Sequence, residues 1–153
     1  MGNEIWHSTE QLKSPHGRAK LVELCELIAT NAEVSIFTKV PLFLGDKLGE
    51  ASRAALMKGL LTHFEPDSTI AEHRFVYEGR LPGVQTKADE RTTSELKRMG
   101  KLHADVDIRA RRKEDEPLLW LADTVATAFR QNFTSRNSDY WDALKSCSSV
   151  INS

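Results

Sequence analysis

The residue whose surroundings point most directly to chemistry is Asp123. It lies within residues 118–129, a run that is apolar nearly all round the helix that it predicts, and such a helix is buried on most of its sides. A carboxylate in that setting costs several kcal/mol unless it is paired, hydrogen-bonded or bound to a metal ion. Two interpretations stay open: Asp123 holds a metal or another ligand, or it caps a loop or pairs with an arginine such as Arg80.

Glu78 is the second acidic candidate. It directly follows residues 75–77, whose aromatic and β-branched side chains predict a strand. If that strand is parallel and central, Glu78 lies at its carboxyl end, where open α/β sheets place their ligands. The alternative is an acid that ends a strand and faces solvent.

Asp89 and Glu116 are weaker candidates, because each has a structural explanation. Asp89 stands where we expect the third helix to begin, so it suits an N-terminal cap. Glu116 precedes Asp123 by two helical turns, about 10 Å along the same face, which places both acids along one cleft but too far apart to share one ion. An acid at a helix N-terminus, stabilised by the helix dipole, is the simpler interpretation of Glu116.

One basic cluster begins near the end of the third expected strand and comprises Arg109, Arg111, Arg112 and Lys113. Such a cluster is ordinarily a solvated edge. Because it is close in sequence to the two later acids, it also fits a basic rim around a carboxylate site, which a phosphodiester substrate requires.

The composition disfavours several classes of protein. Among 153 residues, 21 Lys and Arg stand against 22 Asp and Glu, and the net charge of -1 gives no overall basic field for nucleic acid. Two cysteines cannot form the disulfide framework of a small secreted domain, and the five histidines show no zinc-ligand spacing. No apolar run is long enough to span a membrane. We expect one cytoplasmic α/β domain whose chemistry, if it has any, rests on carboxylates.

Apolar periodicity predicts helices that alternate with strands, which favours a partly parallel sheet with helices on its faces. We expect residues 1–133 to form this domain and residues 134–153 to form a C-terminal helix and a frayed tail. The expected helices cover residues 20–30, 48–64, 88–101 and 118–130, and the expected strands cover residues 34–40, 70–77 and 104–110.

The segment Glu-Pro-Leu-Leu-Trp-Leu-Ala-Asp-Thr-Val-Ala at residues 116–126 resembles the C-terminal motif of domain-of-unknown-function family 3800, an RNase H-like family of bacteria and phages. Residues 4–12 are similar to the short segment before that family's first helix. Residues 75–78 resemble its inner acidic strand, and Asp89 matches an Asp that follows it. The resemblance spans residues 4–130.

This resemblance implies an RNase H-like three-layer α/β fold, with a small mixed sheet flanked by helices. It also implies two divalent metal ions that cleave phosphodiester bonds. Glu78 would be the acid of the middle strand and Asp123 that of the last helix, both as ligands of Mg²⁺ or Mn²⁺. Asp89 and Glu116 would be further catalytic acids, with His7 near the same cleft. Family members open with an Asp-bearing strand, which this chain lacks, so we expect a short sheet.

Two functions of different classes follow from these observations. The chain is a metal-dependent nuclease, or it is a non-catalytic RNase H-like module that binds nucleic acid or a protein. In the second case, the sheet edge left by the missing strand would accept a partner strand or a second copy of the chain. A small-molecule α/β enzyme is a third interpretation, but the sequence has no cofactor motif to support it.

Overall fold

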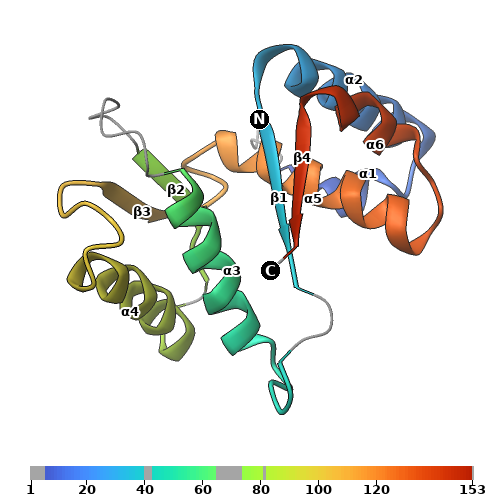
Figure 1. The fold of residues 1–153 in the computed structure, drawn as a ribbon. Coiled ribbons are helices and arrows are strands. Elements are labelled where there is room, and N and C mark those ends of the chain that lie inside the picture. The colour runs from blue at the N-terminus through green and yellow to red at the C-terminus, as the bar shows by residue number, and fades with distance from the viewer. Residues whose placement is uncertain (1–5, 40–42, 65–73, 81, 153) are drawn as a thin grey trace. The chain divides into compact units, whose positions relative to one another are not determined.

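The computed structural model describes residues 6–39, 43–64, 74–80 and 82–152, and the chain divides into two compact units. Unit 1 combines residues 1–36 with 112–149, and unit 2 combines residues 37–111 with 150–153. The chain contains helices and small sheets (Figure 1), which confirms the α/β class expected from the sequence. None of the helices in the described part of the chain combines the length and the apolar character that a bilayer crossing requires.

Unit 1 is mainly helical. Its helices are α1 (Ser8–Gln11), α2 (Pro15–Asn31), α5 (Leu118–Thr134) and α6 (Asp139–Leu144), followed by the short 3-10 helix η1 (Lys145–Cys147). Helices α2, α5 and α6 surround one apolar core (Figure 1). Burying a large apolar side chain fully in such a core stabilises the folded state by about 1.5–3 kcal/mol. The core comprises Leu21, Cys25, Ile28, Val34, Val125, Ala128, Tyr140, Trp141 and Leu144. The boundary expected at residue 133 falls inside α5.

Helix α2 begins at Pro15, where the Ser-Pro pair at residues 14–15 predicts a helix start ahead of the apolar positions of residues 20–30. The Ser14 hydroxyl accepts a hydrogen bond from the Gly17 backbone N–H at 3.0 Å, and Pro15 is the first helical residue. A serine cap followed by proline is a common helix start, because the cap satisfies an N–H that the helix leaves unpaired. The helix start that this Ser-Pro pair predicts is therefore confirmed.

Unit 2 consists of α3 (Glu50–His63), β2 (Arg74–Glu78), α4 (Val84–Arg98) and β3 (Asp107–Arg111). Strands β2 and β3 pair in parallel, with Phe75 opposite Ile108. These two side chains pack against the buried core residues Leu61 of α3 and Leu96 of α4, together with Leu102. Both helices therefore cover the same face of the β2–β3 ribbon.

The remaining strands are β1 (Val34–Thr38) and β4 (Ser148–Asn152), which pair with each other. The expectation of a frayed tail is therefore wrong. Hydroxyl contacts join Ser35 to Ser149 at 3.3 Å, and Thr38 donates to Asn152 at 2.6 Å. In the described residues the strands form two two-stranded sheets, β1–β4 and β2–β3, where one three-stranded sheet was expected. The expected strand ends at residues 40 and 70 lie outside the described residues.

Gly17→Ala in α2 is expected to destabilise the protein, although alanine within a helix is ordinarily favoured over glycine by about 1 kcal/mol. A Cβ at position 17 would lie 2.3 Å from the backbone oxygen of Gln11, so the backbone must move. We expect the free energy of unfolding, measured by urea denaturation, to fall by about 2 kcal/mol.

Gly59→Ala in α3 is the matched control. Among the residues that the structure describes, its Cβ would contact only the Phe37 ring, at 3.5 Å, which is an ordinary van der Waals distance. This substitution should therefore raise the stability in the usual way. A stabilising effect at position 17, or equal effects at both positions, would contradict the close approach of α1 to α2.

Candidate functional site

Asp123 lies in the second turn of α5, and two groups of unit 1 hold its carboxylate. The Ser8 backbone N–H donates to Oδ2 at 3.0 Å, and Lys113 Nζ lies 3.3 Å from the same oxygen. The Lys113 side chain is only 9% exposed, so this ion pair is largely removed from water, while the Asp123 side chain keeps 25% exposure. Asp123 is thus paired, as one interpretation of the sequence had it, but its partner is Lys113 rather than Arg80.

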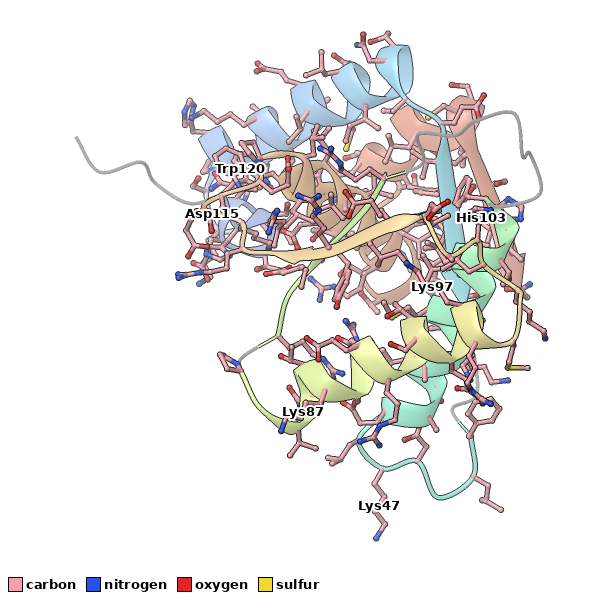
Figure 2. All side chains as sticks on the ribbon, turned by 90° about the vertical axis from the view of Figure 1, so that its left-hand side faces the viewer. Lys47, Lys87, Lys97, His103, Asp115 and Trp120 are labelled. Carbon is pink, nitrogen blue, oxygen red and sulfur yellow. The ribbon has the colours of Figure 1, made fainter. Side chains whose placement is uncertain are left out.

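A buried network of hydroxyl and indole groups lies next to this ion pair. Ser8 and Thr124 are both fully buried, and their hydroxyl oxygens lie 3.1 Å apart. The indole N–H of Trp6 donates to both hydroxyls, at 2.8 and 3.2 Å. Trp120, at the start of α5 (Figure 2), donates its indole N–H to the backbone oxygen of Lys113 at 3.0 Å. The bonds of Trp6 and Ser8 to Thr124 attach the start of α1 to α5, and the bond of Trp120 attaches α5 to the segment that carries Lys113.

The surroundings of Asp123 keep it ionised. Burial raises the pKa of this carboxyl, but the hydrogen bonds from Ser8 and the positive charge of Lys113 outweigh burial, so the pKa lies below its ordinary value. An ionised carboxylate can accept hydrogen bonds or bind a cation. It cannot act as a general acid at neutral pH.

Asp89 lies in the second turn of α4, because that helix begins at Val84 and not at residue 88 as expected. The expected capping role is therefore wrong. Asp89 is 3% exposed and is held by two arginines. Arg53 donates from Nε and Nη2 at 3.1 and 3.2 Å, and Arg80 donates from Nε and Nη2 at 3.1 and 2.8 Å. The carboxylate thus joins α3 to α4 and to the loop after β2.

The arginine cluster around Asp89 is balanced in charge. Arg80 also donates to Glu50 at 2.6 Å, so two guanidinium groups face two carboxylates. Burial raises the pKa of Asp89, but the hydrogen bonds from Arg53 and Arg80 lower this pKa by more than burial raises it. The carboxyl therefore stays ionised. The cluster is therefore an internal salt-bridge network of unit 2.

The other acidic candidates and His7 lie near the ends of helices and strands. Glu78 is exposed at the end of β2, opposite Arg111 in the strand register. Glu116 accepts a hydrogen bond from the Leu118 N–H at 3.4 Å, in keeping with an acid at the start of α5. His7 is exposed at the N-cap of α1. Glu116 and His7 thus lie at helix N-termini, and this structural position accounts for both residues without a catalytic role.

The basic cluster of the sequence separates into residues with different surroundings. Arg109 and Arg111 are exposed on β3, and Arg112 is exposed and pairs with Glu114 at 3.0 Å. Lys113 is buried against Asp123. Only the arginines therefore remain available as a surface for phosphate groups.

The candidate acids are divided between the two units. Glu78 and Asp89 belong to unit 2, whereas Glu116 and Asp123 belong to unit 1. Within residues 6–39, 43–64, 74–80 and 82–152, no three His, Cys, Asp or Glu side chains are grouped so that they could hold a metal ion. The residues that sequence reasoning missed are Trp6, Ser8 and Thr124. The one signal for them was a threonine beside Asp123 in an apolar helix, since a buried hydroxyl requires a partner.

Comparisons of the chain with protein-family models, with curated proteins and with solved structures find no match.

Proposed function

We propose that this chain is a non-catalytic RNase H-like module that binds the phosphate backbone of nucleic acid. The observation that carries the proposal is a row of arginines on one face of the β2–β3 ribbon. Side chains alternate between the two faces of a strand. Because Phe75 and Ile108 face the core of unit 2, Arg74, Arg109 and Arg111 lie on the opposite face.

The arginine face is exposed and partly ordered by acids. The Arg74 and Arg109 side chains are 66% and 48% exposed, and both pair with Asp107, at 3.2 and 2.7 Å. Planar guanidinium groups match the geometry of phosphate better than ammonium groups do. Since Glu78 and Asp107 offset part of the positive charge, we expect weak binding without sequence preference, with a Kd of about 10⁻⁴–10⁻⁶ M.

The surroundings of the buried Asp89 and the partly buried Asp123 support a binding module over a nuclease. A two-metal centre requires carboxylates that give their oxygens to the ions. Here the carboxylate oxygens of Asp89 already accept hydrogen bonds from Arg53 and Arg80. Oδ2 of Asp123 already contacts Lys113 Nζ and the Ser8 N–H. Metal binding at either acid would have to displace ion pairs that already offset its charge.

The test is the binding of fluorescently labelled single-stranded and duplex DNA and RNA, measured by anisotropy. The variant Arg109→Gln/Arg111→Gln removes two cations of the face, and we expect its affinity to fall by roughly tenfold or more. The control Arg91→Gln/Arg98→Gln removes the same charge from exposed positions of α4 and should bind almost as the wild type does. Equal losses in both variants would show a general charge effect and contradict the proposed face.

Metal-dependent hydrolysis is the second candidate function. The observation in its favour is that Asp123 is ionised and a quarter exposed, so one carboxylate of the expected pair is accessible as a ligand. The described side chains do not fit a two-metal centre, and Glu78 with Asp123 as ligands of Mg²⁺ or Mn²⁺ stays a proposal. Cleavage of nucleic acid that requires Mg²⁺ or Mn²⁺ and is lost in Asp123→Asn would favour the nuclease. The expected dimer or partner strand at a sheet edge likewise stays a prediction.

A further inference from the structure

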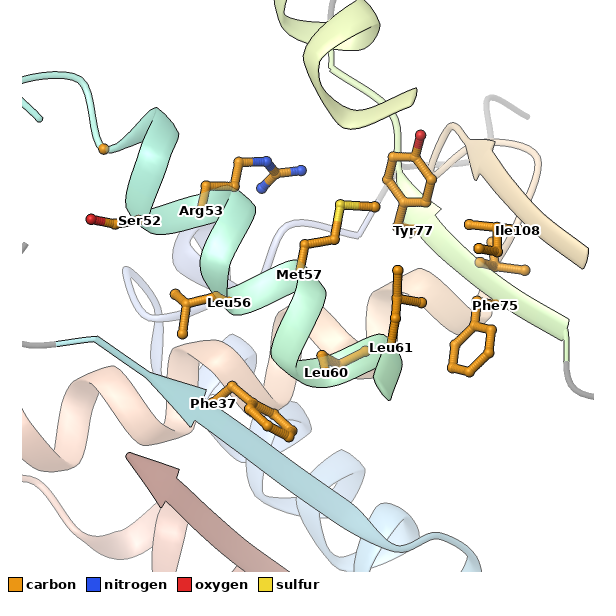
Figure 3. Close-up of a pocket in the computed structure, with 12 residues that line it drawn as sticks. Phe37, Ser52, Arg53, Leu56, Met57, Leu60, Leu61, Phe75, Tyr77 and Ile108 are labelled. Atoms are coloured by element: carbon orange, nitrogen blue, oxygen red, sulfur yellow. The ribbon is translucent and has the colours of Figure 1, made fainter. Parts of the chain in front are cut away.

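Unit 2 contains a cavity of about 440 Å³ between α3 and the β2–β3 ribbon (Figure 3). This volume falls within the range typical of small-molecule sites, about 300–1,000 Å³. Most of its wall is apolar and comes from Phe37, Leu56, Met57, Leu60, Leu61 and Phe75. A wall of this kind favours a ligand with an apolar body.

One end of the cavity carries polar groups. Figure 3 shows the Arg53 guanidinium and the Tyr77 hydroxyl on the same side of the cavity, whereas Leu60 and Phe37 lie on the other. A guanidinium has five N–H donors, and Arg53 uses only Nε and Nη2 in its bonds to Asp89. The Arg53 side chain can therefore donate to a ligand without giving up Asp89.

The charge at this polar end selects the kind of head group. Arg53 and Arg80 are offset by Asp89 and Glu50, so the cluster has no surplus charge. A carboxylate or an ammonium entering the cavity would lose its hydration without gaining an uncompensated opposite charge. A hydroxyl group needs only hydrogen bonds, which Arg53 and Tyr77 can supply.

We infer that this cavity binds a neutral amphiphile, a molecule with an apolar body and one hydroxyl head group directed toward Arg53 and Tyr77. This site is separate in its residues from the arginine face of the proposed function. The probe for the test is 1-octanol, with octanoate as the charged molecule of matched length.

The first experiment titrates 1-octanol into the isotopically labelled wild-type protein and follows methyl NMR signals. We expect saturable shifts at Leu56, Met57 and Leu60, with octanoate at pH 7 binding roughly fivefold or more weakly. Octanoate binding as tightly as 1-octanol would overturn the inference about the head group. Shifts that do not saturate, or that occur at exposed leucines instead, would contradict the inference that 1-octanol binds in this cavity.

The second experiment fills the cavity. Leu60→Trp places a larger side chain in the wall and should weaken 1-octanol binding by roughly tenfold. Leu48→Trp is the matched control, because Leu48 is 87% exposed in the same unit and does not line the cavity. Circular dichroism reports whether both variants fold. Unchanged affinity in folded Leu60→Trp would overturn the site, and if that variant does not fold, the wild-type methyl shifts decide.

Discussion

Asp89→Ala is expected to lower the free energy of unfolding by about 3 kcal/mol. The carboxylate is 3% exposed and accepts hydrogen bonds from both Arg53 and Arg80. Breaking a buried ion pair from one side costs about 3–5 kcal/mol, because the remaining charge stays out of water. We place the effect at the lower end, since Arg80 retains Glu50 and the Arg53 side chain, at 42% exposure, can reach solvent.

Urea denaturation measures this loss, and Asp105→Ala is its control. The Asp105 side chain is 90% exposed in the same unit and lies 3.6 Å from the His103 ring, so its removal should change little. The pKa of Asp89 is lowered, so its stabilisation is complete above the pKa of the unfolded chain, about 4, and is lost as the pH falls through the folded value. Equal effects of the two substitutions would contradict the salt-bridge network.

Asp123→Ala is expected to lower the free energy of unfolding by about 2 kcal/mol. It removes the acceptor of the Ser8 N–H and one anionic partner of the buried Lys113 ammonium. The cost is smaller than at Asp89 because the Asp123 side chain is 25% exposed, which lets water replace part of the contact. Asp115→Ala, at an exposed position before α5, is the control, and a double-mutant cycle with Lys113→Met isolates the pairwise energy.

This stability effect changes how a cleavage assay should be read. Asp123→Ala would lose activity by unfolding as readily as by losing a metal ligand. Asp123→Asn keeps the shape of the side chain and one acceptor oxygen, so it separates the two causes when its melting temperature is measured alongside. A stability of Asp123→Ala equal to that of the wild type would contradict the structural role of the carboxylate.

Much of the fold could be predicted from local patterns. The helix expected over residues 20–30 lies within α2, its Leu21, Cys25 and Ile28 form part of the core of unit 1, and the alternation of helix and strand is present. The pairing of β4 with β1 could not be predicted, because Ser148 and Ser149 lack an apolar alternation and their partner is distant in the sequence. Strand pairing depends on such distant contacts, which local periodicity does not report.

The candidate site, like the fold, has features that local sequence predicts and features that depend on distant contacts. The apolar helix predicted a buried Asp123, whereas the side chain is only partly buried, because Leu118, Ala122 and Ala126 form an exposed stripe of α5. The need of Asp123 for a partner followed from the cost of an unpaired carboxylate. The identity of the partner did not follow, because Lys113 and the Ser8 N–H reach Asp123 only through the packing of α1 against α5. Asp89 was misplaced for a simpler reason: the polar first turn of α4 has no apolar stripe, so the helix was expected to begin four residues too late.

The salt dependence of nucleic-acid binding shows whether the arginines of the β2–β3 face bind phosphate groups. Each phosphate that a cation neutralises releases counterions, and log K falls with log salt concentration by about 0.9 per contact on duplex DNA. Three arginines on the β2–β3 face predict a slope of about -2 to -3 for the wild type, and the slope should become shallower by about 2 in Arg109→Gln/Arg111→Gln. The same slope in both proteins, or no binding by the wild type at low salt, would contradict a nucleic-acid-binding role for this face.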